Sequence, residues 1–204
     1  MKKLPVGIQT FSKIREDDFV YIDKTEIALK LIESGGGYFF LSRPRRFGKS
    51  LFLSTLKSIF RAEKDFFEGL YIYDKYDWSI SYPVIHISFG AGNNKSVEQL
   101  NRNIRDIVQY NEDALEIKCR ENESPKTNFI DLIKLSFNKY NKKVVVLVDE
   151  YDKPILDSID DTKTAIQIRE NLKDFYSVIK DNDEFIKFVF ITGVSKFSKV
   201  SLFS

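Results

Sequence analysis

The chain has 204 residues, which fits one domain with a sizeable core, and its 32 basic and 30 acidic residues nearly cancel. This balance gives no overall field that would indicate nucleic acid or an acidic partner. The single cysteine, Cys119, excludes an internal disulfide, and the single histidine, His86, cannot by itself make a metal site or a Ser-His-Asp triad. No apolar run approaches the ~20 residues that span a bilayer, and the start lacks the apolar stretch of a signal peptide, so we expect a cytoplasmic protein with no membrane partner.

In chain order, Asp23 or Thr25 is expected to cap a helix that runs through Glu33 and is ended by the glycines at 35–37. The short aromatic segment 38–41 predicts the first core strand, and a helix is expected to begin at Gly48. Residues 62–82 are poorly periodic and indicate a helical turn and a loop. A second strand is predicted over 83–88, with His86 in it as a hydrogen-bonded strand residue.

The second half of the chain alternates helical and strand patterns. Pro125 is expected to break the chain between two helices, and Cys119 to lie at a helix end. Helices are predicted over 96–118, 129–140 and 162–180, and strands over 144–148 and 185–192. This alternation indicates an α/β fold with a largely parallel sheet of four core strands.

Residues 42–50, Ser-Arg-Pro-Arg-Arg-Phe-Gly-Lys-Ser, combine a strand exit, a basic loop and the start of an apolar helix. In this arrangement backbone N–H groups and one lysine hold a phosphate chain at a helix N-terminus. The loop departs from the general pattern G-x-x-x-x-G-K-[ST] because Arg43 stands where the first glycine is expected. Pro44, moreover, has no N–H to offer. The alternative interpretation is a basic loop followed by a helix.

A second, independent signal lies one hundred residues later. Five consecutive apolar residues, 144–148, predict a strand buried on both faces, and Asp149 and Glu150 follow it. Open α/β sheets bind their ligands at the carboxyl ends of strands. Asp149 is suited to hold Mg²⁺, and Glu150 to orient and deprotonate an attacking water. The alternative for both is a solvated acidic turn, but the two motifs together predict a nucleoside triphosphate site.

Thr192 ends the strand that follows the Asp-Glu strand by a single helix. In this class of fold that strand usually inserts between the lysine-loop strand and the Asp-Glu strand. The Thr192 hydroxyl would then lie near the terminal phosphate; the alternative, a threonine that caps a strand end, is equally open.

The sequence resembles the bacterial AAA-ATPase-like domain family, a group of P-loop ATPases. The resemblance rests on Leu41 to Ser50, on Val148-Asp-Glu-Tyr-Asp-Lys-Pro154, and on Gly7 to Phe11 with Tyr21-Ile-Asp-Lys-Thr25, and Arg43 is the family's own form of the loop. The family is distantly similar to archaeal ATPases of the STAND type. It is often fused to a nuclease-like domain of the PD-(D/E)XK type.

The resemblance implies a P-loop NTPase three-layer sandwich with the ASCE type of strand order. Residues 1–37 would form an N-terminal linker and helix region, and 38–204 a core that stops before its last strand. The cofactors implied are ATP and Mg²⁺. The resemblance assigns the phosphates and metal to Gly48, Lys49 and Ser50, the metal also to Asp149, and water activation to Glu150.

Further contacts with the nucleotide are expected from Arg45, Arg46, Phe47 and Leu51 around the loop. Tyr21 is expected beside the adenine, with core packing as the alternative. Catalytic roles are expected for Glu150, Lys49 and Thr192, and hydrolysis would need the elements missing from the core.

Three functions stay open at this point. The first is an ATP-binding module that, in a full-length context, hydrolyses ATP to drive a conformational or assembly switch. The second is a nucleotide sensor that does not hydrolyse, and the third a nucleic-acid surface on the basic face 43–61. A homo-oligomer or a protein partner is possible for each, and nucleic acid could also be met through the absent nuclease-like domain.

Overall fold

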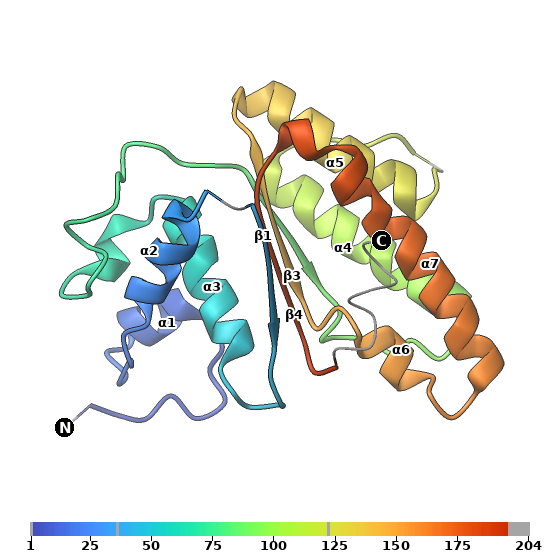
Figure 1. The fold of residues 1–204 in the computed structure, drawn as a ribbon, viewed down its shortest axis with the longest axis horizontal. Coiled ribbons are helices and arrows are strands. Elements are labelled where there is room, and N and C mark those ends of the chain that lie inside the picture. Colours follow the sequence, from blue (N-terminus) through green and yellow to red (C-terminus); the bar gives the residue numbers. More distant parts are fainter. Residues whose placement is uncertain (1, 36, 122, 196–204) are drawn as a thin grey trace.

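A computed structural model describes residues 2–35, 37–121 and 123–195. Within these residues a parallel sheet forms the middle of three layers, with helices on both faces (Figure 1). The strand order is β1-β4-β3-β2. The strands are β1 (Tyr38–Ser42), β2 (Val84–Ser88), β3 (Val144–Asp149) and β4 (Ile186–Gly193). The expected α/β fold is confirmed, and β4 inserts between β1 and β3 as predicted.

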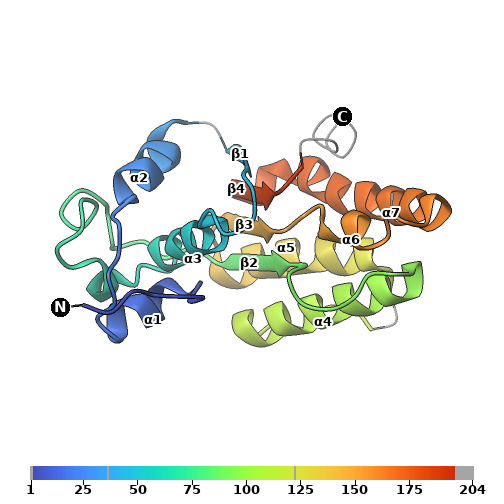
Figure 2. The ribbon, with the colours of Figure 1, turned by 90° about the horizontal axis from the view of Figure 1, so that it is seen from below.

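The helices divide between the two faces of the sheet (Figures 1 and 2). One face carries α1 (Phe11–Glu16), α2 (Thr25–Glu33) and α3 (Lys49–Phe60), and the other carries α4 (Val97–Leu115), α5 (Pro125–Tyr140) and α7 (Thr162–Asp181). A short helix, α6 (Lys153–Asp157), follows β3, and 3-10 turns cover Lys64–Phe67 and Asp183–Phe185.

The strand β3 is buried along its whole length, as its run of apolar residues predicts. Because successive side chains point to opposite faces, Val146 and Val148 join the core under α4, α5 and α7. Val145 and Leu147 join the core on the α3 side. Burial on both faces places the end of β3, and therefore Asp149, at a rigid position in the sheet.

Three helices differ from the sequence-based expectation. Pro125 does not break the chain; it occupies the first turn of α5, and the Ser124 side chain accepts a hydrogen bond from the Thr127 amide at 3.2 Å. Proline suits this position because its missing N–H would have no helical partner there. The short helices α1 and α6 were not predicted, since one or two turns leave too little periodicity to detect.

The segment 21–25 joins α2 to the loop that follows the first 3-10 turn. Asp23 accepts hydrogen bonds from the Thr25 amide at 2.8 Å and, through its other oxygen, from the Tyr71 amide at 2.7 Å. The Thr25 hydroxyl accepts from the Ile72 amide at 3.2 Å. Neither of the two expected caps is the N-cap of α2, which is Lys24 without a side-chain cap bond. Asp23 lies one residue earlier, and its hydrogen bonds fix the turn that leads into the helix.

Candidate functional site

The loop between β1 and α3 runs along the carboxyl edge of the sheet. Its Arg43 amide donates to the Gly193 carbonyl at 3.2 Å, which holds the loop against the end of β4. Two residues adopt left-handed backbone conformations, Arg46 with φ of 67° and Gly48 with φ of 73°. A β-carbon at Gly48 would meet nothing within 4 Å, so its φ alone favours glycine there.

Lys49 is the first residue of α3 and is buried, with 6% of its surface exposed. Its ammonium group donates to the Pro44 carbonyl at 3.0 Å, so the side chain folds back across its own loop. Ser50 follows in the first turn of the helix, where backbone N–H groups lack helical partners. The lysine, the serine hydroxyl and the helix N-terminus are thus brought together, which is the donor set that suits a phosphate.

The three arginines of the loop are not paired with acids in the part of the chain that the structure describes. Arg43, Arg45 and Arg46 are exposed, and none of them belongs to an ion pair within the described part of the chain. Phe47 is 64% exposed. The structure therefore places these side chains around the loop but leaves their predicted nucleotide contacts without direct support.

Asp149 and Thr192 meet at the ends of β3 and β4. Asp149 is 7% exposed and Thr192 is fully buried, and the threonine hydroxyl donates a hydrogen bond to the aspartate carboxylate. The same hydroxyl oxygen accepts from the Glu150 amide at 3.3 Å. Since β4 lies between β1 and β3, Thr192 stands between the lysine loop and Asp149.

Glu150 lies just past the strand in a left-handed conformation, with φ of 53°. A β-carbon built on Gly90 would lie 3.6 Å from the Glu150 Oε2 atom and 3.4 Å from the Ser88 hydroxyl. The carboxylate is therefore turned toward the end of β2. Ser88 is the register partner of Asp149, and no motif in the sequence pointed to its place in the site.

An apolar cavity of about 220 Å³ lies against the N-terminus of α3. It is lined by Leu4, Pro5, Val20, Tyr21, Ile22, Lys24, Gly48, Leu51 and Phe52. The Tyr21 hydroxyl lies 3.2 Å from the Thr55 hydroxyl of α3, and its ring packs edge-on against Phe11. Tyr21 thus both packs in the core and lines a cavity that reaches the lysine loop at Gly48.

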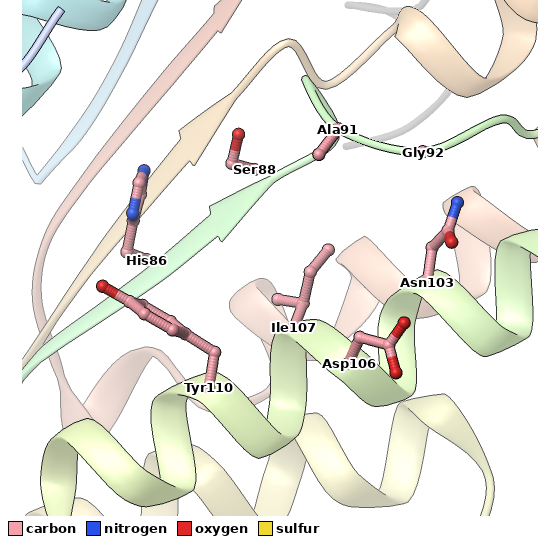
Figure 3. Close-up of a pocket in the computed structure, with 8 residues that line it drawn as sticks. All are labelled: His86, Ser88, Ala91, Gly92, Asn103, Asp106, Ile107 and Tyr110. Atoms are coloured by element: carbon pink, nitrogen blue, oxygen red, sulfur yellow. The ribbon is translucent and has the colours of Figure 1, made fainter.

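A separate pocket of about 420 Å³ lies between the end of β2 and α4 (Figure 3). Its lining consists of His86, Ser88, Ala91, Gly92, Asn103, Asp106, Ile107 and Tyr110, and the Tyr110 side chain reaches from α4 toward His86. The expected hydrogen-bonded ring is not found for His86: its Nε2 has no partner within the described residues. Burial, followed by the nearby Lys57 charge, lowers the pKa of His86 to about 4, so the ring is neutral.

The backbone of His86, by contrast, is satisfied by one side chain. Asn111 of α4 accepts from the His86 amide at 2.8 Å and donates to its carbonyl at 2.9 Å. These two bonds cover the free edge of β2 as a neighbouring strand would.

Among the described residues, no helix combines the length and apolar character required to cross a membrane, and no group of three or more metal-ligating side chains occurs.

Comparison with known proteins agrees with this geometry. The family model described as "Predicted AAA-ATPase" matches residues 5–203. A protein of Azotobacter chroococcum mcd 1, described as an uncharacterized protein in the vnfD 5' region, is 52% identical over all 204 residues, and the chain spans 39% of that relative's length. No solved structure matches the chain. With a match over residues 5–203, the chain belongs to the predicted AAA-ATPase family.

Proposed function

We propose that this chain binds ATP with Mg²⁺ at the carboxyl edge of its sheet and, in a longer context, hydrolyses it to drive a conformational or assembly switch. One observation carries the proposal: the loop that holds Lys49 lies beside the same β4 end whose Thr192 hydrogen-bonds Asp149. A phosphate chain held by the lysine loop therefore lies along a sheet edge that also presents carboxylates.

The base of the nucleotide would occupy the apolar cavity beside Tyr21. This cavity and the lysine loop share Gly48, so a ligand with an aromatic ring and a phosphate chain can span both. No guanine-reading Asn-Lys-x-Asp segment occurs in the sequence, which favours adenine over guanine.

The metal would be held by the Ser50 hydroxyl and the Asp149 carboxylate, hard oxygen ligands of the kind that Mg²⁺ prefers. When bound, Mg²⁺ would neutralise part of the negative charge on the phosphates. Lys49 adds positive charge at the terminal phosphates, and Thr192 orients Asp149 through their hydrogen bond. Glu150, turned toward Ser88 and Gly90, would accept the proton of a water attacking the γ-phosphate.

Calorimetric titration with Mg-ATP tests the binding step. Lys49→Ala should weaken binding on the order of 100-fold, because it removes a charge-assisted contact to the phosphates. Lys57→Ala, near the other end of the same helix, is the matched control and should bind like the parent. Equal affinity of the parent and Lys49→Ala would overturn the proposal. Titration with tripolyphosphate separates the base from the phosphates, since ATP should bind more tightly if the Tyr21 cavity holds the adenine.

Comparison of Glu150→Gln with the parent tests the hydrolytic step. A general base contributes roughly 10²- to 10⁴-fold, so a loss of that size is expected with nearly unchanged ATP affinity. Equal rates in the two proteins would show that Glu150 is not the base. Because the proposal places hydrolysis in a longer context, both proteins are compared in that context. Binding without hydrolysis there would favour the sensor alternative, which uses the same binding residues.

A further inference from the structure

The turn that follows β3 is joined to the exit of β4 by a network of hydrogen bonds. We call this network the β3–β4 clasp; it consists of residues 150–152 and 192–195. The Tyr151 amide donates to the Thr192 carbonyl at 3.0 Å, and the Tyr151 hydroxyl donates to the Ser195 carbonyl at 3.1 Å. The Glu150 amide is also part of it, through its bond to the Thr192 hydroxyl. Two segments about 40 residues apart in sequence are thereby held as one unit.

Asp152 supplies the largest number of these bonds. Its carboxylate accepts from the Val194 amide at 3.1 Å, from the Ser195 amide at 2.6 Å and from the Ser195 hydroxyl at 2.7 Å. Asp152 is buried, with only 2% of the residue exposed. Because protein donors already occupy this buried carboxylate with three hydrogen bonds, it is poorly placed to activate a water molecule. Asp152 therefore differs in kind from Glu150, two residues earlier.

Glu150 needs such support because its left-handed backbone is unfavourable for a residue with a side chain. Conformations of this kind persist where surrounding contacts fix them, and they cluster at functional sites. Its amide is bound by Thr192, and its carbonyl accepts from the Lys153 amide at 3.0 Å. The first of these bonds depends on the position of the β4 exit, which Asp152 holds.

We propose that Asp152 is a positioning residue that orients Glu150. By binding the backbone of Val194 and Ser195, it keeps the exit of β4 against the turn, and the turn then directs the Glu150 carboxylate toward Ser88. This inference rests on the proposed function for its chemical meaning, but the physical linkage can be measured without nucleotide.

Residue-resolved amide hydrogen exchange tests the linkage directly. Asp152→Asn keeps the size of the side chain but turns an NH₂ group toward backbone donors. We expect exchange to accelerate at least tenfold at Val194 and Ser195, and also at Glu150 and Tyr151, while the amides within β3 keep their parent rates. Asp157→Asn is the matched control, because within the described ranges that carboxylate bonds Lys153 and Asn94 and makes no bond to β4.

Two results would overturn the proposal. Acceleration confined to Val194 and Ser195 would show that the clasp does not reach Glu150, and uniform acceleration throughout β3 would show a merely structural role. Should Asp152→Asn fail to fold, Ser195→Ala removes one of the three donors and should give the same pattern at a smaller size. The absence of any acceleration at Glu150 in that variant would equally contradict the linkage.

A double-mutant comparison of ATP hydrolysis, made in the longer context in which the proposal places hydrolysis, provides the catalytic readout. If Asp152 acts through Glu150, Asp152→Asn should lower kcat at least tenfold and leave KM within threefold of the parent value. The double variant Asp152→Asn with Glu150→Gln should then be no slower than Glu150→Gln alone. A further tenfold loss in the double variant would refute action through Glu150. Failure of the proposed function would look different: the parent would not bind Mg-ATP in the titration, whereas the exchange result would stand.

Discussion

Gly193 ends β4 at a position with no space for a side chain. A β-carbon built there would lie 2.2 Å from Cε1 and 2.4 Å from Cδ1 of Tyr151, and 2.8 Å from an Asp152 carboxylate oxygen. Carbon atoms in good contact stand about 3.5–4.0 Å apart. The Tyr151 ring would thus have to recede by more than about 1 Å. It is fully buried and packs edge-on against Phe40, so it has little freedom to do so.

We therefore expect overpacking in Gly193→Ala to cost about 2–3 kcal/mol, near the upper end of typical values. Alanine also restricts the unfolded chain, a gain of about 0.4–1 kcal/mol, so the free energy of unfolding should fall by about 1–2.5 kcal/mol. Gly37→Ala is the matched control: its β-carbon would meet only the Lys187 carbonyl oxygen, at an ordinary 3.8 Å. The control should be neutral or slightly stabilising.

Urea denaturation of the parent and both variants measures these differences, with a constant m-value as the condition for comparing midpoints. A Gly193→Ala protein within about 0.5 kcal/mol of the parent, the usual range for surface substitutions, would refute the reasoning. It would mean that Tyr151 and Asp152 can move away from β4 at little cost, and the clasp would then be too soft to position Glu150.

The remaining predictions concern two titratable groups. The pKa of His86 is about 4 in the folded chain and about 6.5 in the unfolded chain. Between these pH values the imidazole is protonated in the unfolded state and neutral in the folded state. The free energy of unfolding should therefore fall by up to about 3 kcal/mol as the pH drops from about 6.5 to about 4. In His86→Asn this pH-dependent loss should be smaller, and equal pH dependence of the two proteins would contradict the prediction. Burial, with Glu112 nearby, raises the pKa of the Cys119 thiol to about 12. At pH 8 we expect the native thiol to react with Ellman's reagent at least ~100-fold more slowly than in urea, and comparable rates would show that the site opens readily.

Much of the fold follows from local patterns in the sequence. The apolar run at 144–148 predicted a strand buried on both faces, and the helical spacing of residues 162–180 predicted α7, because both periods are visible within a few consecutive residues. Pro125 misled the prediction because proline is compatible with the first turn of a helix as well as with a break. The sequence cannot choose between these roles without knowing whether Ser124 caps the helix.

The candidate site divides in the same way. Lys49, Ser50, Asp149 and Glu150 could be found from the sequence, since each stands in a short motif at a strand end. The roles of Thr192 and Asp152 depend on partners about 40 residues away, and local spacing carries no information about such partners. The Tyr21 cavity likewise forms only when the N-terminal segment packs against α3. The sequence by itself determined the residues of the candidate site and the strand order that brings Lys49, Thr192 and Asp149 to one edge of the sheet. Only the tertiary structure decided how these groups are held, because long-range hydrogen bonds and the Tyr21 cavity arise from packing of the whole chain.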